Sequence, residues 1–385
     1  MKIVLISNLY PPLDRGGAEQ VAQKMAENLQ KIGHEVFVFT LGRENKEETI
    51  NEVKVFRYRA KNLFFYSDDF KNPIWKRLFW HIFDVFNIFS YFEVKNFLKK
   101  HQPDLVICHN LKGLGYLTVK AIADLQIKQI YVAHDIQLAV PSGLMYFQKE
   151  NSFIANGFLT KIYCKICARL FQKVDLVISP SKWLLEFYEK RGFFEKSQKT
   201  VLQTPVFLPE AKIENKKRTR KFIYIGQLEK HKGIDWLLSF WDENCKDLIL
   251  EVVGDGSLRH DLQLKYPKIK FYGKIDAKTI LNEFDFLIMP TLVFENAPTV
   301  IPLALAFGVP VLVNDLGGSA ELIIENKNGF TLQPQNKVQL KSILEKIKNL
   351  SDDEYREMSL VAIRSIENLN ENEYFSQLNL LLQNL

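Results

Sequence analysis

Short apolar runs alternate with longer amphipathic segments along nearly the whole chain. In the first half each run is rich in β-branched residues and ends in a polar turn, a pattern typical of parallel strands that helices cover on both faces. The runs are KIVLIS (2–7), EVFVFT (35–40), DLVICHN (104–110), QIYVAHD (129–135) and DLVISPS (175–181). A helix is predicted over residues 18–32, so this order of elements predicts an α/β domain.

The pattern restarts after a dense charge run, KIENKKRTRK (212–221), which we interpret as a solvated connector. The later runs are FIYIG (222–226), LILEVVGDG (248–256), IKFYGKI (269–275), FDFLIMP (284–290) and VPVLVND (309–315). They have the same character as the first set. They therefore predict a second doubly wound parallel sheet.

The predicted organisation is two Rossmann-like domains, residues 1–206 and residues 207–371. The last segment, residues 372–385, is amphipathic and is expected to form a helix that packs back on the first domain. Two open α/β sheets joined by a linker leave a cleft between them. Ligands of such sheets bind beyond the carboxyl ends of the strands, so we expect the functional site in this cleft.

Composition narrows the class of protein. With 385 residues, 47% of them hydrophobic and 25% charged, the chain is globular rather than disordered or fibrous. The net charge of +6 suits an anionic substrate or an acidic membrane surface and falls short of a nucleic-acid-binding footprint. The opening MKIVLISNLYPP indicates a strand and a turn rather than a signal peptide, and the best apolar run, 301–313, is too short to span a membrane. We expect a cytoplasmic protein and leave open a peripheral contact with the inner face of the cytoplasmic membrane.

The cysteines do not indicate a metal site. Cys164 and Cys167 form YCKIC within a predicted helix, and no second cysteine pair or suitable histidine lies nearby in sequence. A structural zinc ion needs four ligands. We therefore predict packed or surface thiols in a reducing compartment and no metal.

Two glycine-containing loops of the second half could approach a phosphate. Lys232 and Gly233 stand at a predicted helix start, where free backbone N–H groups, the positive helix end and an ammonium group converge. Gly254 and Gly256 lie in a strand-to-helix turn. Their missing side chains would let a ligand approach the backbone, or the turn would need glycine for its geometry alone.

Glu295 is the acid that precedes a nearly continuous apolar run. The segment ENAP (295–298) forms a turn after a strand that ends at Pro290, and an apolar helix is predicted over residues 299–307. One interpretation is a charge that stabilises the helix N-terminus by about 0.3–1 kcal/mol. The other is a carboxylate that accepts hydrogen bonds from substrate hydroxyls, and the apolar setting favours this functional interpretation.

These motifs together resemble the large nucleotide-sugar-dependent family of retaining GT-B glycosyltransferases with a Glu-x7-Glu motif (glycosyltransferase family 4-like). The resemblance covers almost the full length of the chain. It rests on the order and spacing of PPLDRGGAEQVAQKMAENLQKIGHEV, PDLVICHN, AHD, VDLVISPSKWL, IGQLEKHKGID, VVGDGSLR, FYGKI, FENAPTVIPLALAFGVPVLVNDLGGSAELI and NGF.

The resemblance implies roles for matching positions. His134 would reach the donor sugar, Lys232 would neutralise the diphosphate and Glu295 would bind sugar hydroxyls, and these three are the catalytic candidates. The loop at Lys274 and Ile275 would read the base through its main chain. The implied donor-binding residues are Gly16, Gly17, Gly226, Gln227, Lys232, Gly254, Gly256, Lys274, Ile275, Glu295, Asn296, Ala297, Pro298, Thr299 and Leu303. Preorganised cations and N–H groups would stabilise the departing nucleoside diphosphate without a metal.

Two positions depart from the family pattern. Leu303 stands where the second glutamate of the motif would bind the ribose hydroxyls, and Gln227 stands where the family usually has arginine. Leucine accepts no hydrogen bond, and a neutral amide binds phosphate less strongly than a guanidinium. Each lost hydrogen bond to a charged group costs roughly 1.5–3 kcal/mol, so donor binding would weaken on the order of a hundredfold or be achieved differently.

Three further features keep two interpretations each. The segment 72–100 is rich in aromatic residues with basic residues at both ends, which fits a membrane-surface helix or a helix packed on the sheet. His109 is an acceptor-side candidate or a structural histidine. Asp135 is a second acceptor-side candidate, because it could orient His134, or it caps a turn.

The resemblance implies a metal-independent retaining glycosyltransferase that needs no cofactor. It would move a sugar from a nucleotide sugar to a glycan or lipid-linked acceptor during surface polysaccharide or glycolipid assembly, without contacting nucleic acid. One alternative is a degenerate, non-catalytic relative that acts as a binding subunit, which Leu303 and Gln227 favour. Another is a sugar-nucleotide epimerase or a phosphorylase on the same fold.

Overall fold

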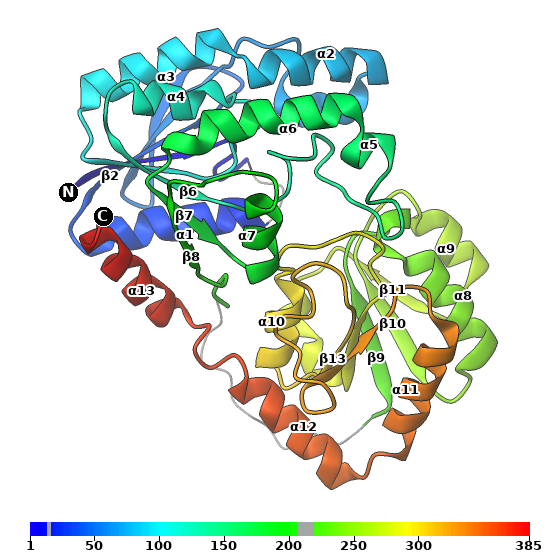
Figure 1. Cartoon of the computed structure of the whole chain (residues 1–385). Helices are drawn as coiled ribbons and strands as arrows, with labels where there is room; N and C mark the ends of the chain where they lie inside the picture. Colours follow the sequence, from blue (N-terminus) through cyan, green and yellow to red (C-terminus); the bar gives the residue numbers. More distant parts are fainter. Residues whose placement is uncertain (14–16, 207–218) are drawn as a thin grey trace. The chain divides into compact units, whose positions relative to one another are not determined.

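The computed structural model describes residues 1–13, 17–206 and 219–385, which fall into two compact units (Figure 1). Unit 1 comprises Met1–Gly143, Asn151–Leu202 and Phe375–Leu385, and unit 2 comprises Leu144–Glu150 and Gln203–Tyr374. The short segment 144–150, which the sequence analysis counts in the first domain, thus groups with unit 2. Each unit is described by itself below.

Unit 1 is built on an eight-stranded sheet in the order β3-β4-β2-β1-β5-β6-β7-β8. Neighbouring strands are parallel except for β3 and β4. The strands are β1 (Lys2–Ser7), β2 (Glu35–Leu41), β3 (Lys46–Ile50), β4 (Val53–Tyr58), β5 (Leu105–Cys108), β6 (Lys128–Val132), β7 (Leu176–Ser179) and β8 (Gln198–Val201). The central strand β1 is buried along residues 3–6, because helices cover both faces of the sheet.

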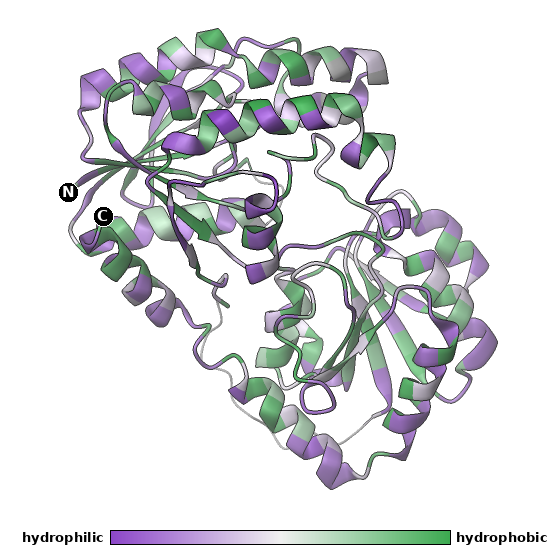
Figure 2. Ribbon diagram, in the orientation of Figure 1, coloured by the Kyte–Doolittle hydropathy of each residue, from purple (hydrophilic) through white to green (hydrophobic). Residues whose placement is uncertain are grey.

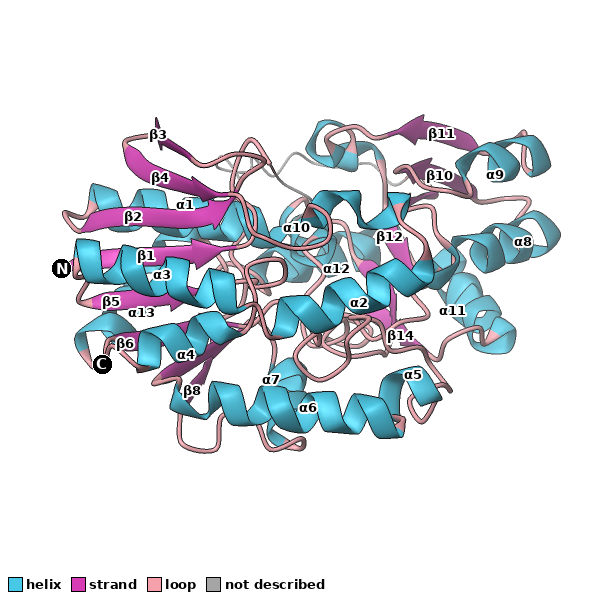
Figure 3. Ribbon diagram, turned by 90° about the horizontal axis from the view of Figure 1, so that it is seen from above, coloured by secondary structure: helices cyan, strands magenta, loops and turns pink. Residues whose placement is uncertain are grey.

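The helices of unit 1 form a layer on each side of this sheet. Figures 1 and 3 show α2, α3, α4 and α6 on one side and α1 and α13 on the other. The helices are α1 (Gly17–Lys31), α2 (Ile74–Val85), α3 (Ile88–His101), α4 (Leu117–Ala123), α5 (Phe153–Asn156), α6 (Phe158–Leu170), α7 (Lys182–Glu189) and α13 (Glu371–Gln383). Among the described residues, no helix combines the length and apolar character that crossing a bilayer would need.

Unit 2 is built on a six-stranded parallel sheet in the order β11-β10-β9-β12-β13-β14. The strands are β9 (Lys221–Ile225), β10 (Ile249–Val253), β11 (Lys270–Gly273), β12 (Phe286–Met289), β13 (Val311–Asn314) and β14 (Gly329–Leu332). The helices are α8 (Ile234–Asn244), α9 (Arg259–Lys265), α10 (Val300–Ala306), α11 (Lys337–Asn349) and α12 (Asp352–Arg364).

Both faces of the unit 2 sheet carry a core. Phe222 and Tyr224 of β9 belong to one buried apolar cluster, while Ile223 between them belongs to another. Successive side chains of a strand point to opposite faces, so this division means that β9 is covered on both sides. Figure 2 shows the resulting hydrophobic colour along the strands of both sheets.

The strand order creates a switch point in each sheet. In unit 2 the chain runs outward from β9 through β10 to β11 and then returns to β12 on the other side of β9. In unit 1 it runs from β1 through β2 to β4 and returns to β5 on the other side of β1. Ligands of such sheets bind beyond the carboxyl ends of the strands at this point. The loops after β9 and β12, and those after β1 and β5, are therefore the places to look for a site.

Candidate functional site

Lys232 and Glu295 meet at the switch point of unit 2. Lys232 lies in the loop after β9, in a 3-10 turn formed by Lys230–Lys232, and α8 begins two residues later. Glu295 lies in the loop after β12. Their Nζ and Oε1 atoms are 2.5 Å apart, and the two side chains remain about one-fifth exposed, at 23% and 20%. A cation and an anion are thus paired where a ligand can still reach both.

Backbone bonds hold these two loops together. The N–H of Leu292 donates to the carbonyl of His231 at 2.9 Å, which joins the loop after β12 to the loop after β9. The N–H of Gly318 donates to the carbonyl of Glu295 at 2.8 Å, and Glu295 forms an isolated β-bridge with Gly317. The backbone on both sides of the Lys232–Glu295 pair is therefore fixed by neighbouring loops.

The carboxylate of Glu295 is oriented through one of its oxygens. The hydroxyl of Thr291 donates to Oε1 at 3.2 Å, and the Asn314 side-chain amide donates to the Thr291 carbonyl at 2.8 Å. The bonds from Lys232 and Thr291 both end on Oε1. Helix α10 begins at Val300 after an N-cap, Thr299, that makes no side-chain cap bond. Glu295 stands four residues before this N-cap.

Thr291 and Asn314 are site residues that the sequence analysis missed. Both are fully or almost fully buried, and both follow or end a strand, after β12 and at the end of β13. A small polar residue at the carboxyl end of a buried parallel strand is a readable signal. The contacts of Thr291 and Asn314 with each other and with Glu295 cannot be predicted from the sequence, because they depend on how separate loops meet.

The glycines after β10 are explained by packing between loops. Gly254 has φ +141°, and a Cβ atom there would overlap the carbonyl oxygen of Gly226. The Gly226 N–H donates to the carbonyl of Val253 at 3.0 Å, so the backbones after β9 and β10 lie in direct contact. A Cβ on Gly256 would come within 2.6 Å of the Leu228 carbonyl oxygen. Of the two interpretations of Gly254 and Gly256, the geometric one has direct structural support.

A side-chain clamp reinforces the same contact. Glu229 accepts hydrogen bonds from the N–H and the hydroxyl of Ser257, both at 2.7 Å. The bond from the Ser257 N–H holds the pKa of the Glu229 carboxyl below its usual value. The Tyr224 hydroxyl donates to the carbonyl of Gln227 at 2.8 Å, which fixes the backbone of that residue while its side chain is exposed. Gln227 is therefore presented from a rigid loop.

The remaining donor-side candidates lie on other loops of unit 2. Lys274 and Ile275, which follow β11, are exposed. The turn that holds Asn296, Ala297 and Pro298 is half-buried, and it leads into α10. The side chain of Leu303 packs partly buried against the apolar cluster that includes α10. These positions keep their predicted roles as expectations.

In unit 1 the structure brings His109 and His134 together. His109 follows β5 and His134 lies two residues beyond the end of β6, so their strands are neighbours in the sheet. Their Nδ1 and Nε2 atoms are 2.9 Å apart and their rings stack with centroids 5.1 Å apart. Burial lowers the pKa of His134 to about 4, and burial beside His134 lowers the pKa of His109 well below its ordinary value. Both imidazoles are neutral at neutral pH, so one donates to the other.

The Asp135 side chain caps the turn that follows it. Its Oδ1 accepts the N–H of Gln137 at 2.8 Å, and its backbone carbonyl accepts the Tyr188 hydroxyl at 2.5 Å. Burial raises the pKa of the Asp135 carboxyl above its usual value. Of the two candidate glycines at the start of unit 1, Gly17 is the first residue of α1 and Gly16 lies outside the described residues.

The cysteines are free thiols. Cys108, Cys167 and Cys245 are buried and Cys164 is partly exposed. Burial raises the pKa of Cys167 to about 12, so its thiol stays protonated at neutral pH. Within residues 1–13, 17–206 and 219–385 there is no group of three or more His, Cys, Asp or Glu side chains placed to hold a metal ion.

Comparison with known proteins places the two halves of the chain in one class. The profile described as Glycosyltransferase Family 4 matches residues 15–206, and the one described as Glycosyl transferases group 1 matches residues 219–353. An uncharacterized 42.6 kDa protein from the cps region of Klebsiella pneumoniae is 25% identical over 330 residues, which cover 84% of this chain and 87% of that protein.

Solved structures share the fold. Sucrose-phosphate synthase from Thermosynechococcus elongatus aligns with a TM-score of 0.76 at 19% identity, covering 100% of this chain and 98% of that one. HepE from Anabaena, solved in complex with UDP, aligns with a TM-score of 0.71 at 15% identity, and each chain is fully covered. Both domain profiles and the strand order of the two sheets agree with the predicted family. The chain belongs to the GT-B glycosyltransferases that combine a family 4 N-terminal domain with a group 1 C-terminal domain.

Proposed function

We propose that this glycosyltransferase moves a sugar from a nucleotide-sugar donor to a glycan or lipid-linked acceptor with retention of anomeric configuration and without a catalytic metal. The observation that carries the proposal is the Lys232–Glu295 pair at the switch point of unit 2, 2.5 Å apart and still partly exposed. A nucleotide sugar presents a diphosphate and sugar hydroxyls within a few bonds of each other. The pair offers a cation for the first and an acceptor for the second.

Lys232 would bind the diphosphate of the donor, and Glu295 would bind its sugar. Lys232 has three ammonium donors, and one is engaged by Glu295 in the free protein. The diphosphate would occupy the others and gain more attraction as negative charge gathers on it in the transition state. The Glu295 carboxylate would accept hydrogen bonds from the sugar hydroxyls. Both groups are held in place before the donor arrives, so little reorganisation is needed.

The transfer step itself needs no protein nucleophile. The acceptor hydroxyl would attack the anomeric carbon from the face that the diphosphate leaves, which forms the new C–O bond as the bond to phosphate breaks. The hydroxyl proton would pass to an oxygen of the departing phosphate. In unit 1 we assign the neutral His134 to a hydrogen bond with the sugar, with His109 as the group that holds it in place through the 2.9 Å bond. A neutral imidazole suits this role, because it exchanges hydrogen bonds with hydroxyls without adding charge.

The relatives support a role in surface polysaccharide assembly. The Klebsiella pneumoniae relative is encoded in a cps region, and HepE was solved with UDP. We take a UDP-sugar as the first donor to test and a polysaccharide precursor as the acceptor.

A donor screen tests the proposal. The full chain is incubated with UDP-, GDP-, ADP- and dTDP-sugars, and release of the nucleoside diphosphate is measured with and without a chelator. The wild-type protein should hydrolyse one donor, and the chelator should not change the rate. The Lys232→Ala variant should hydrolyse the same donor much more slowly. Lys278→Ala, an exposed lysine of the same unit, is the matched control and should behave like the wild type. Loss of hydrolysis in chelator would contradict metal independence, and equal rates in the two variants would contradict the role of Lys232.

The second candidate function is donor binding without transfer. Two observations favour it: Leu303 offers no acceptor where the family glutamate would stand, and Gln227 offers a neutral amide where an arginine would stand. Calorimetry with the same nucleotide sugars separates the two functions. Binding without hydrolysis or transfer would favour this second candidate, while turnover would exclude it.

A further inference from the structure

Helix α2 points an apolar stripe outward. Trp75, Phe79, Ile82 and Phe83 are each more than half exposed, and their spacing of four, three and one residues puts them on one helical face. The opposite face is buried, with Trp80 only 1% exposed. The sequence analysis left residues 72–100 as either a membrane-surface helix or a helix packed on the sheet. Within α2, Trp80 packs inward as a core residue, whereas the outward stripe does not. An exposed aromatic row of this length marks an interaction surface.

A second apolar stripe lies on α5 and the start of α6. Its members are Phe153, Ile154, Phe158 and Leu159, which are 65% to 73% exposed. The segment around them, residues 151–174, contains four basic residues and no acidic residue. The basic residues are Lys161, Lys165, Arg169 and Lys173. Helix α6 thus combines an exposed apolar end with an entirely cationic set of charges.

The helices that carry the two stripes belong to the same layer of unit 1. Figures 1 and 3 both show α2 and α6 in the helical layer that covers one side of the unit 1 sheet. The charges of α2 are Lys76, Arg77 and Asp84. Asp84 points inward, where it is buried and accepts the N–H of Gly113 at 2.8 Å. The acid of α2 is therefore withdrawn from the surface, and we name the surface formed by α2, α5 and α6 the α2–α6 face.

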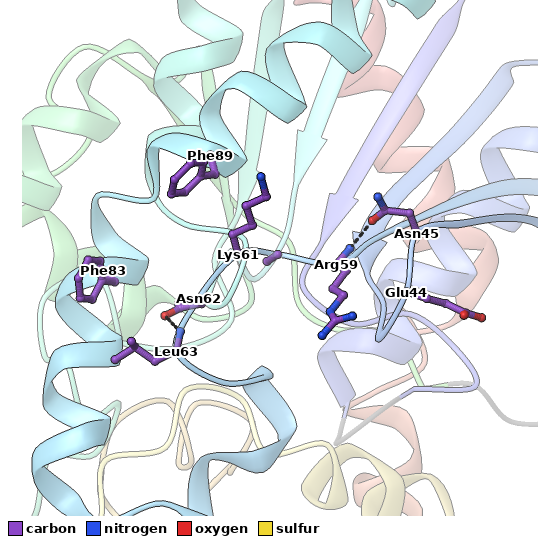
Figure 4. A pocket seen from close by; sticks show the side chains of 9 residues that line it. Glu44, Asn45, Arg59, Lys61, Asn62, Leu63, Phe83 and Phe89 are labelled. Carbon is purple, nitrogen blue, oxygen red and sulfur yellow. Dashed lines mark hydrogen bonds between the residues drawn. The ribbon is translucent and has the colours of Figure 1, made fainter.

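A cavity of about 760 Å³ opens at the end of the α2 stripe. Phe83 and Phe89 line one side and Arg59 lines the other, with the Lys61 side chain between them (Figure 4). The Lys61 ammonium lies 5.1 Å from the centre of the Phe89 ring. Neither Arg59 nor Lys61 forms an ion pair with a described residue, and Glu44 is the acid on the cavity lining. Cations beside exposed aromatic rings match an anionic headgroup attached to a hydrocarbon chain.

We propose that the α2–α6 face binds the surface of a bilayer that contains anionic phospholipid, with a lipid headgroup phosphate in the cavity at Arg59 and Lys61. Amphipathic helices of this kind lie in the membrane interface with aromatic and leucine side chains inserted and basic side chains at the headgroups. The charges of α6 are all basic, and basic charges next to exposed apolar side chains are the combination by which amphipathic helices bind an anionic lipid surface. The inference does not depend on which sugar is transferred.

Vesicle sedimentation tests the proposal without donor or acceptor. The full chain is mixed with vesicles of phosphatidylcholine alone or of phosphatidylcholine with phosphatidylglycerol. Binding is expected to the mixed vesicles only, and it should weaken as salt is added, because part of the attraction is between exposed charges. The double variants Phe153→Ser/Phe158→Ser and Lys161→Glu/Lys165→Glu should each bind at least about tenfold more weakly. The Arg59→Ala/Lys61→Ala variant should weaken binding too.

Matched variants in unit 2 control for general changes in surface character. Leu264→Ser/Val338→Ser removes two apolar side chains that are 71% and 81% exposed, and it should bind vesicles like the wild type. All substituted side chains are exposed, so circular dichroism and melting temperature should stay unchanged. Equal binding by all variants, or no binding by the wild type, overturns the proposal. A concentration-dependent dimer that the same variants abolish, seen by sedimentation velocity, would assign the face to a second copy of the chain instead.

Discussion

The ammonium of Lys232 and the carboxylate of Glu295 are 2.5 Å apart although the residues are 63 positions apart in sequence. Both side chains keep about one-fifth of their surface exposed. An ion pair in such a setting contributes only about 0–1 kcal/mol to stability, because solvent screens it and both side chains lose conformational freedom. Stability alone is therefore a weak reason for this arrangement, and two groups held by three loops at a switch point are better explained by a ligand.

Replacing Glu295 with alanine should separate function from stability. We expect transfer to fall by on the order of a hundredfold or more, because a preorganised group is removed from the sugar, while the melting temperature stays nearly unchanged. Transfer rate and thermal melting are measured together. Glu345→Ala, which removes a surface ion pair with Lys348, is the control and should leave both unchanged. A large loss of stability with transfer intact would show that Glu295 is structural.

The loop that supports Glu295 should tolerate no side chain at Gly317. This residue has φ +70°, and an added Cβ would overlap the carbonyl oxygen of Glu295. Gly192 has φ +76°, and a Cβ there would meet only the Glu195 carboxylate, at 3.7 Å. Gly192→Ala should therefore cost about 1 kcal/mol for the left-handed backbone alone. Gly317→Ala should cost more and should also weaken donor binding.

Urea unfolding and calorimetry with the donor measure the two effects of that substitution. Similar losses of stability in Gly317→Ala and Gly192→Ala, with donor affinity unchanged, would mean that the loop shifts aside and that Glu295 does not depend on it.

The sequence predicted the strands that form a nearly continuous apolar run, and it missed β3, β4, β8 and β14, which do not. The runs at residues 2–7 and 222–226 form β1 and β9, and the predicted helix at 299–307 is α10 within one residue at each end. Strand β3, KEETI, was missed because it lies at the sheet edge with mostly exposed, charged residues. An edge strand buries little, so it leaves no hydrophobic signature.

The site was predictable one residue at a time and not as pairs. Lys232 and Glu295 were chosen for their places after strands, but their contact depends on loops that meet only in the folded sheet. The sequence also left two interpretations of Gly254. The carbonyl of Gly226 that requires a glycine there comes from a neighbouring loop, so the contact is seen only in the folded sheet. The direction of the α2 stripe stayed open between the two interpretations of residues 72–100, since helical periodicity shows that a face is apolar and not which way it points.

The histidine pair should make stability fall in mild acid. Burial lowers the pKa of His134 to about 4 in the folded protein, against about 6.5 in the unfolded chain. Below pH 6.5 the unfolded chain therefore binds more protons, so the free energy of unfolding decreases as the pH falls from about 6.5 to about 4. A shift of this size corresponds to up to about 3 kcal/mol. His109 contributes in the same direction, because its pKa is also lowered.

Urea unfolding between pH 7 and pH 4 measures this loss. The His134→Asn variant should show a shallower decrease over that range than the wild type, whereas His260→Asn, an exposed residue of α9, should show the wild-type slope. A slope for His134→Asn equal to that of the wild type would mean that the buried imidazole is protonated in the folded state.

Leu303 offers the sharpest test of where the donor ribose lies. It stands eight positions after Glu295 and is half-buried against the apolar cluster of α10, so a carboxylate there would remain within reach of solvent and ligand. If the ribose lies beside it, Leu303→Glu should tighten nucleotide-sugar binding about tenfold or more, since a hydrogen bond to a charged group contributes roughly 1.5–3 kcal/mol. Calorimetry measures the affinity, and Leu303→Gln, which has the same length and no charge, should gain less. The glutamate also loses apolar contacts, so a lower melting temperature is expected and does not bear on the test. An affinity unchanged in both variants would place the ribose elsewhere and leave the loop at Lys274 and Ile275 as the part of unit 2 to probe next.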